Sequence, residues 1–106
     1  MKFIETKYFL EQIEYLKGKW YNLAKEDYNN FKQTFYKGTE PPLFGTCYKY
    51  RWMNSSIPTG KRWWLRFIML VKDDTCIPLM VYSKKFKQNV SRNEIESAMA
   101  SVYKQM

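Results

Sequence analysis

The first third of the chain has apolar residues at helical spacing. In one stretch they recur every three or four positions, the period of an amphipathic helix: Phe9, Leu10, Ile13 and Leu16. Thr6 can cap the start of this helix, and Gly18 interrupts the pattern. A second stretch repeats the period and ends at Lys37-Gly38, a basic last turn and a glycine stop; its apolar positions are Trp20, Leu23, Ala24, Tyr28, Phe31 and Phe35. The two stretches therefore predict an α-hairpin with one apolar stripe on each helix.

The middle of the chain has the features of β-strands. Residues 1–5 already predict a short first strand, and residues 39–46 are rich in Pro and Gly and predict a loop. Strong strand signals then follow, separated by polar turns: Cys47–Trp52, Trp63–Val71 and Thr75–Tyr82. Because the connections are short, these strands should pair antiparallel as a three-stranded meander. Pro78 indicates an edge position or a bulge in the last strand.

The C-terminal segment carries a clear helix start. Ser91 and Glu94 have the spacing of a capping box, and Val90 with Ile95 would form the hydrophobic staple. Apolar residues then follow on one face: Ile95, Ala98, Met99 and Val102. Residues 1–106 are therefore predicted to be a single α+β domain with a short N-terminal strand, an α-hairpin, an antiparallel meander and a C-terminal helix.

The positive charge of the chain is concentrated in the predicted sheet. The net charge is +8, and residues 41–90 contain nine Lys or Arg and two Asp, a local net of +7. A localised basic field favours nucleic acid, an anionic membrane surface or an acidic protein as partner.

The absence of His narrows the possible chemistry. It removes the usual general base, the Ser-His and Cys-His nucleophile pairs and most zinc sites. Cys47 and Cys76 lack metal-ligand spacing and are predicted to be buried thiols in a reducing compartment, with a disulfide between them as the alternative. There is no apolar run of about 18 residues and no apolar segment typical of a signal peptide, so we expect a cytoplasmic protein. No metal or other cofactor is expected.

The strand Cys47–Trp52 places cations and aromatics on opposite faces. Side chains two positions apart share a face, so Lys49 and Arg51 lie together, about 7 Å apart along the strand. The aromatic residues Tyr48, Tyr50 and Trp52 lie on the other face and can pack on helices. In the next strand Arg66 lies among apolar neighbours. An arginine in that setting needs an anion, either a carboxylate within the fold or a phosphate of a ligand.

Further basic and aromatic residues flank these strands. The additional cations are Lys61, Arg62, Lys84, Lys85 and Lys87. Tyr82 and Phe86 lie beside the last three and could stack on bases. For Tyr82 the alternative is a core position at a strand end, and for Lys87 a solvated rim is favoured.

The order of elements resembles the RelE/ParE superfamily of bacterial and archaeal toxins, over essentially the whole chain. Cys47–Trp52 is similar to the family's Tyr-Lys-x-basic strand. The segment Trp64-Leu65-Arg66-Phe67-Ile68 is similar to its aromatic-x-Arg strand. Val81–Lys85, followed by Asn89–Ile95, resembles the last strand and the start of the last helix.

The resemblance implies a toxin of a type II toxin–antitoxin pair. RelE-type members enter the ribosomal A site and cut mRNA without a metal, by in-line attack of the ribose 2′-OH on the adjacent phosphorus. By position, Lys49 would be the base assisted by Arg51, while Arg66 and Lys85 would clamp the scissile phosphate. Closely packed cations can depress the pKa of a lysine and so allow it to act as a base. The expected partners are a cognate antitoxin, mRNA and the ribosome with its rRNA.

The remaining RNA contacts implied by the resemblance come from the flanking residues: Lys61, Arg62, Tyr82, Lys84 and Phe86. In some RelE-type toxins a Tyr in the last segment stacks on the target base. That place lies near Ser91 here, so Tyr82 or Phe86 would substitute for it. The alternatives are a ParE-like toxin that inhibits DNA gyrase without cutting RNA, and an inactive RNA-binding relative. The cationic set favours the ribonuclease.

Overall fold

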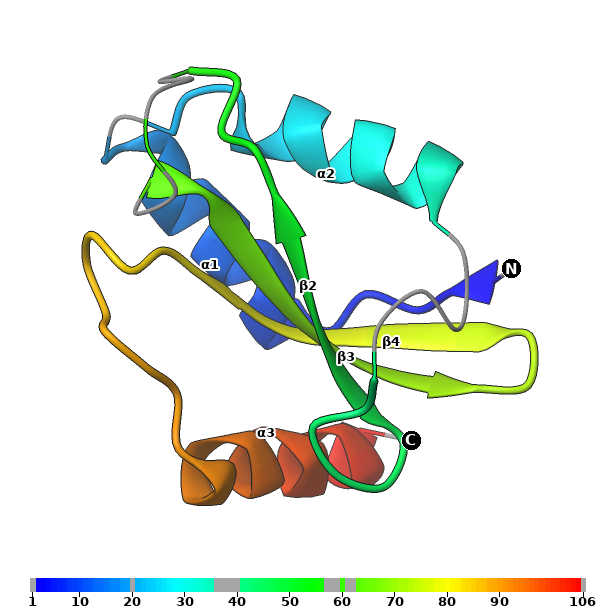
Figure 1. Cartoon of the computed structure of the whole chain (residues 1–106). Helices are drawn as coiled ribbons and strands as arrows, with labels where there is room; N and C mark the ends of the chain where they lie inside the picture. The colour runs from blue at the N-terminus through cyan, green and yellow to red at the C-terminus, as the bar shows by residue number, and fades with distance from the viewer. Residues whose placement is uncertain (1, 20, 36–40, 57–59, 61–62, 106) are drawn as a thin grey trace.

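A computed structural model describes residues 2–19, 21–35, 41–56, 60 and 63–105 (Figure 1). The elements are β1 (Lys2–Phe3), α1 (Lys7–Lys17), α2 (Ala24–Thr34), β2 (Cys47–Trp52), β3 (Leu65–Lys72), β4 (Thr75–Tyr82) and α3 (Arg92–Gln105). They form a mixed four-stranded sheet in the order β1-β4-β3-β2. The helices α1 and α2 cover one face of the sheet and α3 packs on the other. The predicted α+β fold is thereby confirmed, and the short first strand joins the meander as a parallel edge next to β4.

The helical hairpin forms largely as its pattern predicts. The hydroxyl of Thr6 accepts a hydrogen bond from the Phe9 backbone N–H at 3.1 Å, which caps α1. Leu10 was predicted to lie in the apolar stripe of α1, but it is 48% exposed. It follows Phe9 by one residue, so it points about 100° away from the buried side.

The second helix is shorter than its sequence pattern predicts. It ends at Thr34, because Phe35 has extended backbone angles (φ −69°, ψ 132°). This turn lets the Phe35 ring pack edge-on against Tyr50, with the ring centroids 5.0 Å apart. The helix also begins later than predicted, at Ala24, and Leu23 is its N-cap and is 38% exposed. Trp20 and Lys37-Gly38 lie outside the described residues.

The meander follows the predicted strand order with small changes. β2 and β4 have the predicted bounds, whereas β3 begins at Leu65, two residues later than expected. Asp73 has a positive φ of 54° and allows the tight β3–β4 turn, a conformation that Asp tolerates better than most residues. The register of β3 and β4 shifts between Ile68 and Met69, opposite Pro78. The predicted bulge is therefore present.

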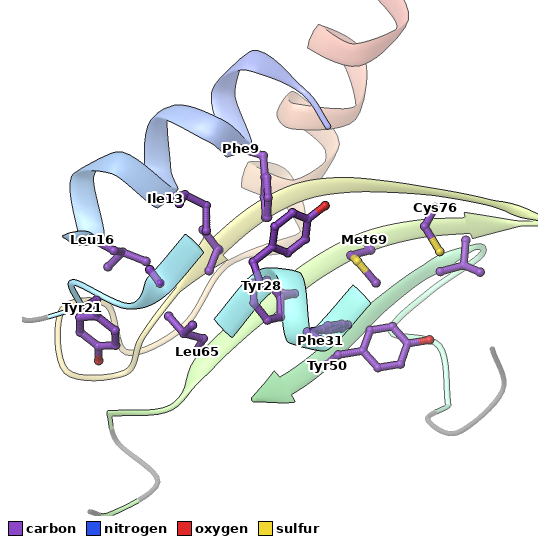
Figure 2. Packing of buried hydrophobic residues seen from close by; sticks show 14 residues of the cluster. Phe9, Ile13, Leu16, Tyr21, Tyr28, Phe31, Tyr50, Leu65, Met69 and Cys76 are labelled. Carbon is purple, nitrogen blue, oxygen red and sulfur yellow. The ribbon is translucent and has the colours of Figure 1, made fainter. Parts of the chain in front are cut away.

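Two apolar clusters hold the layers together. Between the hairpin and the sheet, aromatic rings such as Phe9, Tyr28 and Phe31 pack closely (Figure 2). Phe31 is stacked on Phe67, with the ring centroids 4.7 Å apart. The second cluster joins α3 to the opposite face of the sheet. Cys76 belongs to the first cluster and Cys47 to the second, so the two buried thiols lie on opposite faces of the sheet and form no disulfide with each other. Burial raises the pKa of the Cys47 thiol to about 11.

The predicted capping box starts α3. The Glu94 backbone N–H donates to the Ser91 hydroxyl at 3.2 Å, and the Glu94 carboxylate accepts from the Ser91 backbone N–H at 3.4 Å. Val90 and Ile95, the predicted staple, are both buried in the cluster under α3. Among the described residues, no helix is long and apolar enough to cross a membrane.

Candidate nucleic-acid interface

Strand pairing brings the predicted cations onto one face of the sheet. Arg51 on β2 pairs with Arg66 on β3, and Arg66 pairs on its other side with Tyr82 on β4. Lys49 pairs with Ile68, two positions along from Arg66. Side chains alternate between faces along a strand, so all of these residues lie on the side that carries α3. They occupy the end of the sheet where β2 and β4 stop and β3 begins.

A segment after β4 completes this group of charges. The chain leaves Tyr82 and runs down the side of the sheet to the start of α3 (Figure 1). Lys84, near the start of this segment, is close enough to act on Lys49 electrostatically. Partial burial lowers the pKa of the Lys49 ammonium, and the charges of Arg51, Arg66 and Lys84 lower it further. We call Lys49, Arg51, Arg66 and Lys84 the cation cluster.

The cation cluster has an outer and an inner layer. Arg51 and Lys84 are exposed and Lys49 is partly buried. Arg66 is only 2% exposed. An incoming phosphate therefore meets Arg51, Lys84 and Lys49 before it could meet Arg66.

Arg66 is oriented from within the fold. Its Nη1 donates to the backbone carbonyl of Trp64 at 3.1 Å. The partners predicted from the sequence were a carboxylate within the fold or a phosphate of a ligand, and a backbone carbonyl was not among them. Burial lowers the pKa of the Arg66 guanidinium, and Arg51 adds to that effect, while the phenols of Tyr82 and Tyr21 oppose it. The inner layer of the cation cluster is thus the Arg66 guanidinium, with the phenols of Tyr82 and Tyr21 nearby.

Ser83 organises the basic turn that follows β4. It is 1% exposed, and its carbonyl accepts from the backbone N–H groups of Phe86 (3.1 Å) and Lys87 (2.9 Å). Its hydroxyl accepts from the Lys85 backbone N–H at 3.1 Å and from the Tyr21 hydroxyl at 2.5 Å. Neither Ser83 nor Tyr21 was predicted to be part of the site. A Ser in a basic run is a common turn residue, but its partner 62 positions away leaves no local signal.

Lys85 and Phe86 lie in a separate aromatic group. The Lys85 ammonium is 5.2 Å from the centroid of the Trp63 ring, the geometry of a cation–π contact. Phe86 is 44% exposed and packs edge-on against Tyr21 (5.9 Å) and Trp63 (6.4 Å). The structure therefore brings Lys49, Arg51, Arg66 and Lys84 together. It places the Lys85 ammonium over the Trp63 ring, whereas the family resemblance implies a shared phosphate contact of Lys85 and Arg66.

The other predicted residues have varied positions. Tyr82 is buried in the cluster under α3, which is the core alternative for this residue. Lys87 is exposed and forms an ion pair with Glu94 at 2.5 Å, in agreement with a rim position. Lys61 and Arg62 lie outside the described residues.

A hollow on the described surface lies away from the cation cluster. A groove of about 410 Å³ runs between α1, β4 and α3. The described residues that line it include Tyr8, Leu79, Met80 and Glu94, and none of the cation cluster. The described part of the chain also has no group of three or more His, Cys, Asp or Glu side chains that could hold a metal ion.

Comparison with known proteins adds no family assignment. Neither the protein-family models nor the curated proteins contain a match to this chain. The resemblance to the RelE/ParE toxins therefore stays a prediction.

Proposed function

We propose that this protein is a RelE-type toxin of a toxin–antitoxin pair, a metal-independent endoribonuclease that acts on ribosome-bound mRNA in the cytoplasm. The observation that carries the proposal is the environment of Lys49. Its amine is partly buried, and its charged neighbours Arg51, Arg66 and Lys84 all lower its pKa. A lysine in that setting loses its proton more readily and becomes able to accept one from a ribose hydroxyl.

In the proposed reaction the 2′-OH attacks the adjacent phosphorus in line with the leaving 5′-oxygen. Lys49 takes the proton of the 2′-OH, and the new 2′-oxygen–phosphorus bond forms as the bond to the 5′-oxygen breaks. The exposed cations Arg51 and Lys84 stabilise the negative charge that develops on the phosphoryl oxygens. The leaving 5′-oxygen takes a proton from a cation of the same cluster. The products are a 2′,3′-cyclic phosphate and a 5′-hydroxyl.

The aromatic group beside the cluster supports single-stranded RNA as the substrate. Phe86 presents an exposed ring on the turn that also carries Lys84 and Lys85. Base stacking on an aromatic ring together with backbone contacts to lysines is the usual way of binding single strands.

The expected protein partner is an acidic antitoxin. Its acidic or amphipathic segment would cover the basic face and displace α3, because residues 41–90 carry a net charge of +7 and α3 packs beside the cation cluster. A purified complex in which the antitoxin lies wholly on the α1–α2 hairpin would contradict this mode of inhibition.

Primer extension in a translation extract tests the proposed activity. Wild-type protein should produce cuts within codons on translated mRNA. Lys49→Ala should remove them, and Lys72→Ala, an exposed lysine at the end of β3, serves as the matched control and should leave them intact. Gyrase-dependent DNA breaks with intact mRNA would support the ParE-like alternative instead. RNA binding by wild-type protein without any cut would support the inactive relative.

A further inference from the structure

Arg66 is in an unusual place for a residue that would bind substrate. It is 2% exposed, whereas its cross-strand partner Arg51 is exposed to solvent. Its Nη1 is already engaged with the Trp64 carbonyl. An incoming phosphate would reach the exposed cations Arg51 and Lys84 before it could reach the buried Arg66.

We propose that Arg66 is a positioning residue that acts on the reaction through Lys49, as a fixed buried charge, and does not bind the scissile phosphate. This inference rests on the proposed nuclease function. It replaces the phosphate-clamping role that the family resemblance implies for Arg66.

The strand register places the two side chains within reach of each other. Arg66 lies directly opposite Arg51, and Lys49 is the diagonal neighbour on the same face. Diagonal neighbours in an antiparallel pair are about 7–8 Å apart at their Cα atoms, a distance that long side chains easily bridge. Because Arg66 is buried, salt screens its charge less than it screens the exposed cations.

The chemistry of the two groups decides which one gives up its proton. A guanidinium holds its proton far above neutral pH even when its pKa is lowered, whereas an ammonium releases its proton more readily. Where two such cations are held close together at a partly buried site, the repulsion therefore lowers the pKa of the lysine and leaves the arginine charged. Arg66 stays charged and favours the neutral amine of Lys49, which is the form that a general base needs.

The groups around this pair do not cancel the effect. Arg51 from β2 and Lys84 from the turn after β4 act on Lys49 in the same direction as Arg66. The phenols of Tyr82 on β4 and Tyr21 beside the hairpin face Arg66, and burial raises the pKa of both, so they stay neutral at physiological pH. On the α3 side, the charge of Glu94 is paired with that of Lys87.

A titration of Lys49 tests the coupling without any need for activity. The pKa of the Lys49 ammonium is followed by NMR of protein labelled with ¹³C-lysine, with Lys49→Met to assign the signal. In Arg66→Met, which removes the charge and suits a buried site, the pKa should rise by about one unit. Arg66→Lys keeps a charge and should shift it by less. Arg92→Met removes an exposed arginine of α3 and should leave it unchanged. If Arg66→Met does not fold, Arg66→Gln takes its place.

Binding and rate measurements distinguish an Arg66 that acts through Lys49 from an Arg66 that binds the scissile phosphate. An RNA with a 2′-deoxyribose at the cleaved position binds but cannot react, and its affinity for Arg66→Met should stay within about twofold of wild type. Cleavage by Arg66→Met should fall about tenfold at pH 7 and recover when the pH is raised by about one unit. Unchanged titration of Lys49 together with binding weakened by more than about tenfold would overturn the inference and make Arg66 a phosphate ligand. A wild-type protein that cuts no RNA would overturn the nuclease proposal, and the titration would still decide the coupling.

Discussion

Arg51 and Arg66 stand directly opposite one another in neighbouring strands, on the face of the sheet that carries α3. Like charges in a cross-strand pair destabilise a sheet. The other pairs of the same ladder join apolar, aromatic or aliphatic partners, apart from Lys49, which faces Ile68. This repulsive pair lies near one end of an otherwise favourable ladder, where the proposed function requires cations to hold a phosphate, and such a site is where stability is commonly lost.

Arg51→Gln should therefore stabilise the fold. Removal of the repulsion is expected to raise the free energy of unfolding by about 0.5 kcal/mol, and to weaken RNA cleavage at the same time. Urea unfolding measures the first effect and the translation extract the second. Arg92→Gln is the control, because Arg92 forms an ion pair with Glu96 at 2.8 Å and should lose a few tenths of a kcal/mol instead. A less stable Arg51→Gln would contradict the repulsion.

Because of Lys49, the free energy of unfolding should change with pH in the alkaline range. The folded pKa of Lys49 lies below the ordinary value of 10.5, so between these two values the unfolded chain binds the proton more tightly. Below the folded pKa, the charged ammonium of Lys49 therefore lowers the free energy of unfolding. As the pH rises from the folded pKa towards 10.5, this loss of stability is relieved. Tyr21, Tyr28 and Tyr82 have raised pKa values and act in the opposite direction near pH 10.

Comparison with Lys49→Met isolates the contribution of the lysine. The difference in unfolding free energy, wild type minus Lys49→Met, should increase as the pH rises from 7 to about 10. Urea unfolding at several pH values measures it, and the tyrosines cancel because both proteins contain them. A difference that is constant over this range would show that Lys49 titrates normally.

Asp27 should anchor the connection that follows β2. Its carboxylate is 1% exposed and accepts from the backbone N–H of Ser55 at 3.0 Å and from the Ser55 hydroxyl at 2.5 Å. Asp27→Ala should lower the free energy of unfolding by about 2 kcal/mol, because it leaves a backbone donor without its partner. Glu26→Ala, at the exposed neighbouring position, should change it by less than about 0.5 kcal/mol.

A double-mutant cycle assigns the effect of Asp27 to its contact with Ser55. Ser55→Ala should cost less than Asp27→Ala, and the double variant should be more stable than the sum of the two losses predicts. Strict additivity in chemical denaturation would show that Asp27 stabilises the fold by another route.

The Ser91 cap should contribute more to the stability of α3 than the other serines of this helix do. Ser91→Ala removes the hydroxyl that accepts from the Glu94 backbone N–H, and is expected to cost about 1 kcal/mol. Amide hydrogen exchange in the first turns of α3 should become faster. Ser97→Ala, at an exposed position within α3, should be neutral or slightly stabilising since Ala favours helices. Equal exchange rates in the two variants would contradict a working capping box.

Local patterns predict most of the elements correctly. The bounds of β2 and β4, the Thr6 cap and the capping box at Ser91 all follow from residues within a few positions of each other. The end of α2 does not, since Phe35 leaves the helix to pack against Tyr50, which comes later in the chain. A helix end that depends on a distant ring has no local signal.

In the candidate site, too, some features follow from local sequence patterns and others depend on distant contacts. Alternation along the strand correctly places Lys49 and Arg51 on one face, because the pleat of a strand dictates it. It does not show how deeply each cation lies. The apolar neighbours of Arg66 along its strand indicated a buried setting, but its hydrogen bond to the Trp64 carbonyl was not predicted. Alternation also could not show that the Lys85 ammonium lies over Trp63, a contact that the turn around Ser83 brings about.

The amino-acid sequence by itself determined the periodicities, and with them the order of helices and strands and the face on which each cation lies. Only the tertiary structure decided that β1 joins β4, that Arg66 lies in an inner layer, and that Ser83 is held by Tyr21. The physical reason is the range of the interactions. Backbone geometry and capping act within a few residues, whereas burial and hydrogen bonding between distant segments depend on how the whole chain packs.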